Sequence, residues 1–159
     1  MGQKIVILGT GGTIAGTAAS AMDHTGYTAG QLGVAGLLAG LPAACTGAGK
    51  DRFIVEQLAQ LDSKDMGFDV WVKLAQRVAH HLSQTEVQAV LITHGTDTLE
   101  ETAYFLHALL RPAKPVVLTC AMRPATALVP DGPQNMMDAL AVAETPGAVG
   151  VSVVCASAV

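Results

Sequence analysis

The stretch KIVILGTGGTIAGT, residues 4–17, joins a run of strand-forming residues to a loop of glycines and threonines. The apolar run 5–8 predicts a buried strand, and Gly9, Gly11 and Gly12 follow it directly. A glycine-rich loop after a strand is typical of domains that bind phosphate groups. Because two hydroxyl side chains lie in the same loop, the stretch is equally suited to mount a threonine nucleophile.

The glycine spacing argues against a phosphate site. A dinucleotide-binding fingerprint requires glycine at its first, third and sixth positions. Gly9 and Gly11 fill the first two positions, but Ile14 occupies the sixth, and Gly16 comes two residues later. The sequence also lacks the Gly-Lys-Ser or Gly-Lys-Thr of a P-loop. A tight strand-to-loop turn without a ligand remains the simplest alternative to a nucleophile mount.

The composition bounds the class of protein. The chain has 159 residues, of which 50% are hydrophobic and 14% are charged, and its formal net charge is −4. This length suits one domain with a substantial core. The scattered Lys and Arg residues argue against a nucleic-acid partner. No uninterrupted apolar run approaches the ~20 residues that cross a bilayer, so we expect no membrane partner.

The three cysteines indicate in which cellular compartment the protein works and whether it binds a metal. Cys45, Cys120 and Cys155 are odd in number, far apart and without the paired spacing of a metal site. Cys120 and Cys155 lie in apolar runs and are interpreted as core thiols. The N-terminus lacks the charged-then-apolar pattern of a signal peptide. We therefore predict a cytoplasmic protein that uses no metal and no cofactor.

Strand-like and helix-like segments alternate along the chain. Apolar runs predict strands at residues 4–8, 53–58, 89–93, 115–120 and 149–156. Apolar residues at helical spacing predict helices at residues 28–39, 68–82, 99–110 and 131–143. Thr28 is the expected cap of the first helix. Strands separated by helices pair in parallel through right-handed crossovers. The expected fold class is therefore α/β, a layered parallel-type sheet with flanking helices.

Polar residues follow several of the predicted strands. In an open parallel sheet, ligands bind beyond the carboxyl ends of the strands, so residues from distant parts of the chain meet there. Helix caps have the same appearance, and a cap is the simpler interpretation for each of four acidic or hydroxyl residues taken alone, Ser63, Asp65, Asp97 and Asp131. The residues that follow the strands are Thr13, Ser63, His94, Thr96, Asp97, Met122 and Arg123.

Four short motifs carry a resemblance to a known family. Together these motifs resemble those of the bacterial L-asparaginases, and they span essentially the whole chain in the family's order. They are TGGTIAG (10–16), HGTDTLEETA (94–103), AMRP (121–124) and DGPQN (131–135). Members of that family hydrolyse asparagine, and glutamine to varying degrees. The resemblance implies an amidohydrolase whose N-terminal catalytic domain is residues 1–159, apparently truncated before a downstream relay lysine and a smaller C-terminal domain. It also implies a homotetramer built from tight dimers.

The resemblance assigns a nucleophile to the opening loop. Thr13 matches the family threonine that attacks the side-chain amide and forms an acyl-enzyme, and a threonine hydroxyl needs a partner to activate it. Tyr27 matches the tyrosine that hydrogen-bonds this threonine. Since tyrosine titrates near ~10 when unperturbed, we expect proton sharing rather than full deprotonation. Gly12 would let the backbone approach the substrate closely.

Further matched positions imply how the free amino acid is held. Thr96 matches a second threonine, which belongs to a polar relay supporting the reaction. Asp97 matches the carboxylate that binds the substrate's α-ammonium, and Ser63 matches the serine that binds its α-carboxylate. Gly95 and Ala121 match further substrate contacts. Such a site reads both charges of L-asparagine, the expected small-molecule substrate.

Lys64 departs from the family, many of whose members carry Gln, Glu or Ser at the position after this serine. A cation near a substrate ammonium is unfavourable unless it points away. We therefore place Lys64 among the substrate-site residues and expect it to restrict the enzyme toward asparagine. Among the histidines, His94 is interpreted as shaping its loop, and His80 and His81 as solvated at a helix end.

Two alternatives to an asparaginase remain open. The asparaginase-like subunit of the archaeal tRNA-dependent amidotransferase shares the fold, but it carries an extra N-terminal domain that this sequence does not show. A non-catalytic module that binds asparagine is the second alternative. Release of ammonia from free asparagine, as opposed to binding without turnover, separates the module from the enzyme.

Overall fold

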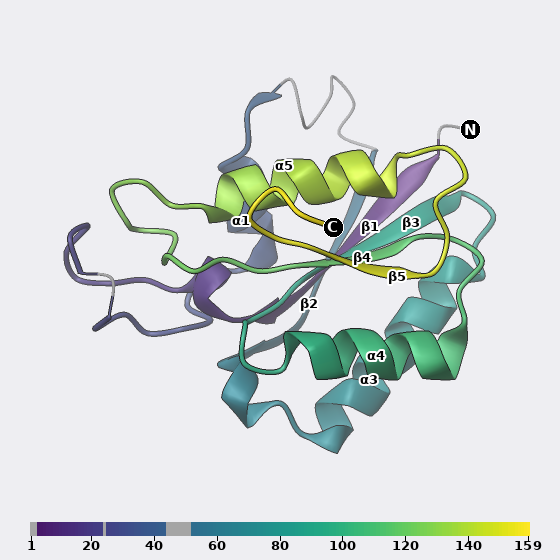
Figure 1. Cartoon of the computed structure of the whole chain (residues 1–159), viewed down its shortest axis with the longest axis horizontal. Coiled ribbons are helices and arrows are strands. Elements are labelled where there is room, and N and C mark those ends of the chain that lie inside the picture. Colours follow the sequence, from purple (N-terminus) through teal and green to yellow (C-terminus); the bar gives the residue numbers. More distant parts are fainter. Residues whose placement is uncertain (1–2, 24, 44–51) are drawn as a thin grey trace.

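The computed structural model describes residues 3–23, 25–43 and 52–159 of the chain. These residues form a five-stranded sheet in the order β2-β1-β3-β4-β5, and every neighbouring pair of strands is parallel (Figure 1). The strands are β1 (Lys4–Gly11), β2 (Phe53–Leu61), β3 (Val87–Thr93), β4 (Val116–Thr119) and β5 (Val151–Val154).

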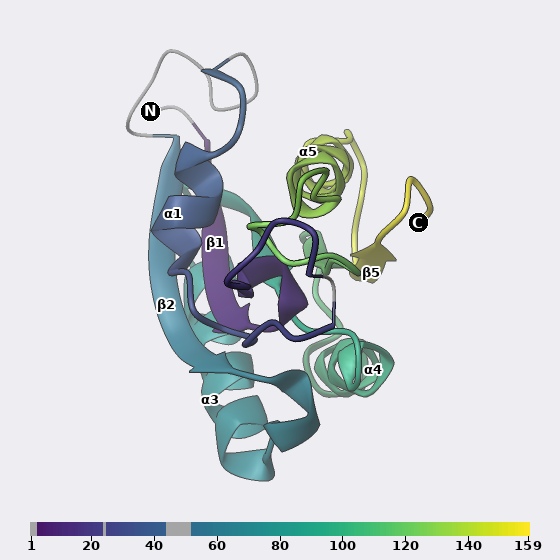
Figure 2. The same cartoon turned by 90° about the vertical axis from the view of Figure 1, so that its left-hand side faces the viewer.

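Helices cover both faces of the sheet. Figure 2 shows α1 and α5 on one face and α3 and α4 on the other. They are α1 (Val34–Ala39), α3 (Phe68–Leu82), α4 (Leu99–Leu110) and α5 (Gly132–Ala143). Alternate strand residues feed the two cores, because side chains along a strand point to opposite faces. In β1, Ile5 and Ile7 pack toward α5, whereas Val6 and Leu8 pack toward α3 and α4.

The predicted α/β class is confirmed, and each predicted strand is present with its ends shifted by a few residues. The first helix was predicted wrongly. It begins at Val34 rather than after Thr28, because Thr28 exchanges backbone hydrogen bonds with Thr17, at N–O distances of 3.0 and 2.9 Å. Gly30 then takes a left-handed conformation with φ of 65°, which a helix does not contain.

The chain leaves the carboxyl ends of the strands in long loops. In Figure 1 these loops lie on the left, where residues 17–23 and 25–28 and residues 122–131 project beyond the sheet. The two loops are joined by backbone hydrogen bonds, from Ala125 to the Gly16 carbonyl at 2.9 Å and from Leu128 to the Ala21 carbonyl at 3.1 Å. The carboxyl edge is therefore where distant parts of the chain converge.

Candidate active site at the carboxyl edge of the sheet

The end of β1 sets the position of Thr13. Gly11 and Gly12 have φ values of 110° and 78°, in the left-handed region that favours glycine. The chain then enters a single 3-10 turn, Thr13–Ala15. Thr10 lies before this reversal, and its hydroxyl donates to the Thr93 carbonyl at 2.9 Å. Of the two hydroxyls in the loop, that of Thr10 therefore joins β1 to β3, and that of Thr13 faces other partners.

Thr13 and Tyr27 are in direct contact. The Thr13 Oγ1 and Tyr27 Oη atoms are 2.7 Å apart, a short hydrogen bond in which either oxygen can donate. Thr13 is 7% exposed. Tyr27 directly precedes Thr28, whose pairing with Thr17 closes the base of the loop. The tyrosine is thus held by the closed base of its loop rather than by the exposed tip.

Three chain segments pack together through glycine. A Cβ at Gly12 would overlap the Cα and N atoms of Gly95, and a Cβ at Gly95 would lie 2.7 Å from the Ser63 Cβ. Real Cβ atoms do not approach other atoms so closely, so only glycine fits at both positions. The loop that carries Thr13 is therefore in backbone contact with the segment that carries Thr96, and that segment is in contact with Ser63.

Ser63 connects the end of β2 to the segment after β3. The backbone N–H of Asp97 donates to Ser63 Oγ at 3.0 Å, and the Thr98 hydroxyl donates to the Ser63 carbonyl at 2.9 Å. Since Ser63 Oγ accepts in the first contact, its own proton stays available for a ligand. Ser63 is 2% exposed, whereas Asp97 is exposed and Thr96 is half-buried.

The Lys64 ammonium is bound by its own turn. Its Nζ donates to Asp62 Oδ2 at 2.7 Å and to Asp65 Oδ2 at 3.1 Å. The hydrogen bond that Lys64 donates to Asp62 raises the pKa of Lys64, and the same contact lowers the pKa of Asp62. Lys64 is adjacent to Ser63 in sequence, but its side chain is exposed and its charge is matched by two carboxylates.

Ala121 is fully buried, with its methyl group in the core beneath α5. Its methyl group is therefore not placed to meet a ligand. Asp131 holds the segment that follows, because its carboxylate accepts from the N–H groups of Met122 and Arg123, both at 2.9 Å. A capping role had been the simplest interpretation of Asp131, but its side chain makes no cap hydrogen bond to α5.

Asn135 was not singled out from the sequence, although it ends the motif DGPQN. It is 2% exposed. Its Nδ2 donates to the Cys120 carbonyl at 2.9 Å, and its Oδ1 accepts from the Ala156 N–H at 3.1 Å. One side chain thus joins the ends of β4 and β5. The motif itself was the available signal, but its partners lie far away in sequence.

His94 lies in a directional chain of buried hydrogen bonds behind the segment 94–97. Its Nδ1 is 2.7 Å from the Gly95 carbonyl, which can only accept, so Nδ1 carries the proton. Its Nε2 therefore accepts from the Thr102 hydroxyl at 3.0 Å, and Trp71 Nε1 donates to that hydroxyl at 2.8 Å. Burial lowers the pKa of His94. The neutral ring therefore supports the loop, and Trp71 and Thr102 are supports that sequence reasoning missed.

His80 and His81 were both interpreted as solvated, and this interpretation was wrong for His81. His80 is exposed, but His81 is 5% exposed and its Nε2 lies 3.0 Å from Glu56 Oε2. Arg77 also binds Glu56, through Nε at 2.8 Å and Nη2 at 2.7 Å. The hydrogen bond from Arg77 lowers the pKa of Glu56. This cluster joins α3 to the edge strand β2.

The residues that the structure describes hold neither a metal-ion cluster nor a membrane-spanning helix. Over residues 3–23, 25–43 and 52–159, no group of three or more His, Cys, Asp or Glu side chains is placed to hold a metal ion. Within that part of the chain, no helix combines the length and apolar character that a bilayer span requires.

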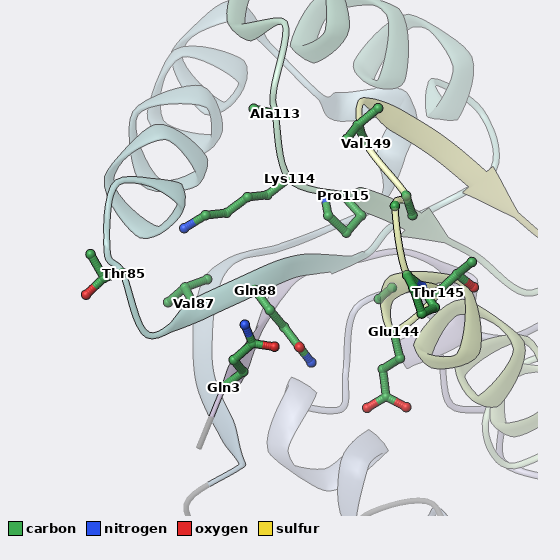
Figure 3. Close-up of a pocket in the computed structure, with 14 residues that line it drawn as sticks. Gln3, Thr85, Val87, Gln88, Ala113, Lys114, Pro115, Glu144, Thr145 and Val149 are labelled. Atoms are coloured by element: carbon green, nitrogen blue, oxygen red, sulfur yellow. The ribbon is translucent and has the colours of Figure 1, made fainter. Parts of the chain in front are cut away.

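A pocket of about 470 Å³ lies at the opposite end of the sheet. The residues that line it include Gln3, Gln88, Lys114 and Glu144 (Figure 3). None of the candidate site residues named above lines it. Because catalysis requires positioned functional groups rather than volume, we assign the candidate site to the carboxyl edge.

Comparison with known proteins identifies the family of the chain. Residues 4–159 match the family described as Asparaginase, N-terminal. The chain is 44% identical over 149 residues to L-asparaginase 2 of Bacillus subtilis, covering 92% of this chain and 38% of the relative. It is 41% identical over 150 residues to the glutaminase-asparaginase of Pseudomonas fluorescens biotype A, covering 94% of this chain and 41% of the relative.

A solved structure gives the same result. The crystal structure of a probable cytoplasmic L-asparaginase from Campylobacter jejuni matches with a TM-score of 0.88 and 43% identity, over 96% of this chain and 46% of that one. The chain thus spans less than half the length of each of these relatives. With both its motifs and its fold in agreement, the chain belongs to the asparaginase family, over the family's N-terminal region.

Proposed function

We propose that this chain is the N-terminal catalytic part of an L-asparagine amidohydrolase that uses Thr13 as its nucleophile. The observation that carries the proposal is the 2.7 Å contact between Thr13 Oγ1 and Tyr27 Oη beyond the end of β1. A short hydrogen bond to a second hydroxyl gives the threonine proton a place to move when the oxygen attacks.

The reaction proceeds in two halves. Thr13 Oγ1 forms a bond to the side-chain amide carbon, its proton passes through the Tyr27 hydroxyl to the departing nitrogen, and ammonia leaves. The resulting ester between Thr13 and the aspartyl group is then attacked by water, which yields aspartate and restores the hydroxyl. Thr96 supports these proton transfers as part of a relay. Backbone N–H groups near Gly12 and Gly95 are suited to stabilise the charge that develops on the carbonyl oxygen.

Recognition of the free amino acid is assigned to Ser63 and Asp97. The exposed Asp97 carboxylate is an acceptor suited to the α-ammonium. The Ser63 hydroxyl keeps a proton for the α-carboxylate, because its oxygen already accepts from the Asp97 backbone. The backbone of Ala121 completes the site. This pairing of charges selects a free amino acid over an asparagine residue within a protein.

Glutamine is a second candidate substrate. One relative carries the name glutaminase-asparaginase and is 41% identical to this chain, so minor glutaminase activity is part of the proposal. We also propose a cytoplasmic homotetramer. The cytoplasmic location is supported by the name of the Campylobacter jejuni protein and by the free thiols of Cys120 and Cys155.

Ammonia release from asparagine tests the proposal, measured with the intact gene product that carries this chain. Replacing Thr13 with alanine should lower kcat about a thousandfold or more, with the unfolding transition unchanged. A reactive substrate analogue should label the peptide that contains Thr13. Labelling of Thr96 alone would reverse the two roles, and asparagine binding without ammonia release would favour the non-catalytic module.

A further inference from the structure

Two free thiols face each other where β4 and β5 end. Thr119 pairs with Val154 in the parallel register of these strands, so the next residues, Cys120 and Cys155, are also opposite each other. Their Sγ atoms are 3.3 Å apart, and both cysteines are free. Nothing in the proposed amide hydrolysis uses either sulfur.

We propose that Cys120 and Cys155 are a site of oxidative modification, at which hydrogen peroxide closes an intrachain disulfide. The backbone spacing permits the bond. Neighbouring strands lie about 4.7–4.9 Å apart, and disulfides join residues whose Cα atoms are about 4.4–6.8 Å apart. The two sulfur atoms have only to close from 3.3 Å to the roughly 2.0 Å of a disulfide.

The two thiols differ in how they meet the oxidant. Cys155 is half-buried, whereas Cys120 is 2% exposed. Burial raises the pKa of Cys120 to about 12, and the thiolate is the form that reacts with peroxide. Cys155 is therefore the peroxide-reactive sulfur, and Cys120 is the thiol that resolves the product.

The chemistry balances in two steps. The Cys155 thiol and one hydrogen peroxide give a sulfenic acid and one water. The Cys120 thiol then attacks that sulfur, its proton leaves with the hydroxyl group as a second water, and the sulfur–sulfur bond forms. Two thiols lose two electrons in total, and one peroxide gains them.

The bond would form beside a contact that shapes the candidate site. The Cys120 carbonyl accepts from Asn135 Nδ2 at 2.9 Å, and the Cys155 Sγ lies 3.8 Å from the same nitrogen. Cys120 directly precedes Ala121. The modification would therefore link the edge strand β5 covalently to the segment that leads into the site, but its formation does not depend on the proposed activity.

Peptide mapping by mass spectrometry tests the proposal directly. The intact protein, carrying Cys45→Ser to remove the third thiol of this chain, is treated with hydrogen peroxide, quenched and digested without reductant. We expect one linked peptide pair containing Cys120 and Cys155, lighter by two hydrogens than the sum of its parts. Dithiothreitol should separate the pair by thiol–disulfide exchange.

Two matched variants assign the order of events. With Cys120→Ala, Cys155 should be trapped as a sulfenic acid by dimedone. With Cys155→Ala, Cys120 should remain a thiol under the same treatment. The proposal is overturned if the folded Cys45→Ser protein gains oxygen atoms on Cys155 while Cys120 stays free. Cross-links only between separate molecules, or no reaction at either sulfur, would overturn it equally.

Discussion

The two ends of the sheet differ in what their polar groups do. At the amino end, the pocket of about 470 Å³ has polar walls, but their charges are already matched. The Lys114 ammonium donates to the carbonyls of Leu82 and Gln84, both at 2.8 Å, and Glu144 pairs with Arg52. At the carboxyl end, by contrast, the polar groups of the candidate site converge from separate strands.

This difference shows which observation identifies a site. The hydroxyl oxygens of Thr13 and Tyr27 are hydrogen-bonded at 2.7 Å, and Ser63 Oγ accepts from the Asp97 backbone at 3.0 Å, which leaves its own proton for another partner. These groups are held by glycine contacts that leave no room for a Cβ. Preorganised groups of complementary chemistry, rather than the size of a hollow, mark the end of the sheet that can carry out a reaction.

After the loss of the Thr13 nucleophile, the largest expected effect is the removal of a charge at the carboxyl end, which is compared with a change at the amino end. Asp97→Ala leaves the substrate's α-ammonium unpaired, a loss of about 2–5 kcal/mol if the bound substrate buries this charge pair. That corresponds to roughly 30-fold to several thousand-fold in kcat/KM for asparagine. Gln88→Ala, in the pocket, should change it less than about twofold. Steady-state ammonia release measures both.

The Asp97 assignment also predicts a loss of selectivity. Asp97→Ala should discriminate poorly between asparagine and an analogue that lacks the amine, whereas the Gln88→Ala protein should retain full discrimination. Equal losses in the two variants would remove the functional distinction between the two ends of the sheet.

Two glycines with similar φ angles sharpen the comparison. Gly12 at the carboxyl end has φ of 78° and Gly147 at the amino end has φ of 80°. Alanine is strained at either position by the positive φ, at a cost of about 1–3 kcal/mol. A Cβ at Gly147 meets nothing within 4 Å, whereas one at Gly12 overlaps Gly95, which adds about 1–3 kcal/mol of overpacking.

Urea unfolding of Gly12→Ala and Gly147→Ala measures this difference in the free energy of unfolding. Gly12→Ala should also lose asparaginase activity, because the clash separates the Thr13 loop from the segment of Thr96. Unfolding of the two variants at the same urea concentration would contradict the inference that the backbone at Gly12 is packed too tightly for a Cβ.

A smaller effect concerns pH. Burial lowers the pKa of His94 in the folded protein, so the folded state takes up a proton less readily than the unfolded state. Its stabilising contribution is therefore present above the unfolded value of about 6.5 and is lost as the pH falls toward the folded pKa. The slope is at most about 1.4 kcal/mol per pH unit.

Unfolding free energies at several pH values between neutral and mildly acidic test this prediction. His94→Asn keeps an N–H for the Gly95 carbonyl but cannot titrate, so its stability should fall less on acidification than that of the unsubstituted protein. His107→Asn, at an exposed histidine near the amino end, is the matched control. A slope left unchanged by His94→Asn would exclude His94 as its source.

The smallest expected effect is on substrate preference. Because two aspartates hold the Lys64 ammonium, Lys64→Gln should raise glutamine activity relative to asparagine activity by less than tenfold, an exposed ion pair being worth about 0–1 kcal/mol. Competition between the two substrates gives the ratio. A ratio that falls or stays constant would remove Lys64 from substrate selection.

Much of the fold could be predicted because its signals are local. The apolar runs of the five strands and the helical spacing of α3 are properties of neighbouring residues, and both appear in the structure. The start of α1 could not be predicted in this way. Thr28 is a good cap by residue type, but its backbone pairs with Thr17, a contact eleven positions away that no local pattern encodes.

In the candidate site, too, some features could be predicted from the sequence and others could not. By itself, the sequence determined the parallel α/β class, the loop that bears Thr13 and the four motifs of the family. The family resemblance also predicted that Tyr27 meets Thr13, as it does. Only the tertiary structure decided that Lys64 turns to Asp62 and Asp65, and that Asn135 joins the ends of β4 and β5. The physical reason is that side-chain partners are chosen by three-dimensional proximity, and parallel strands bring residues far apart in sequence to one edge of the sheet.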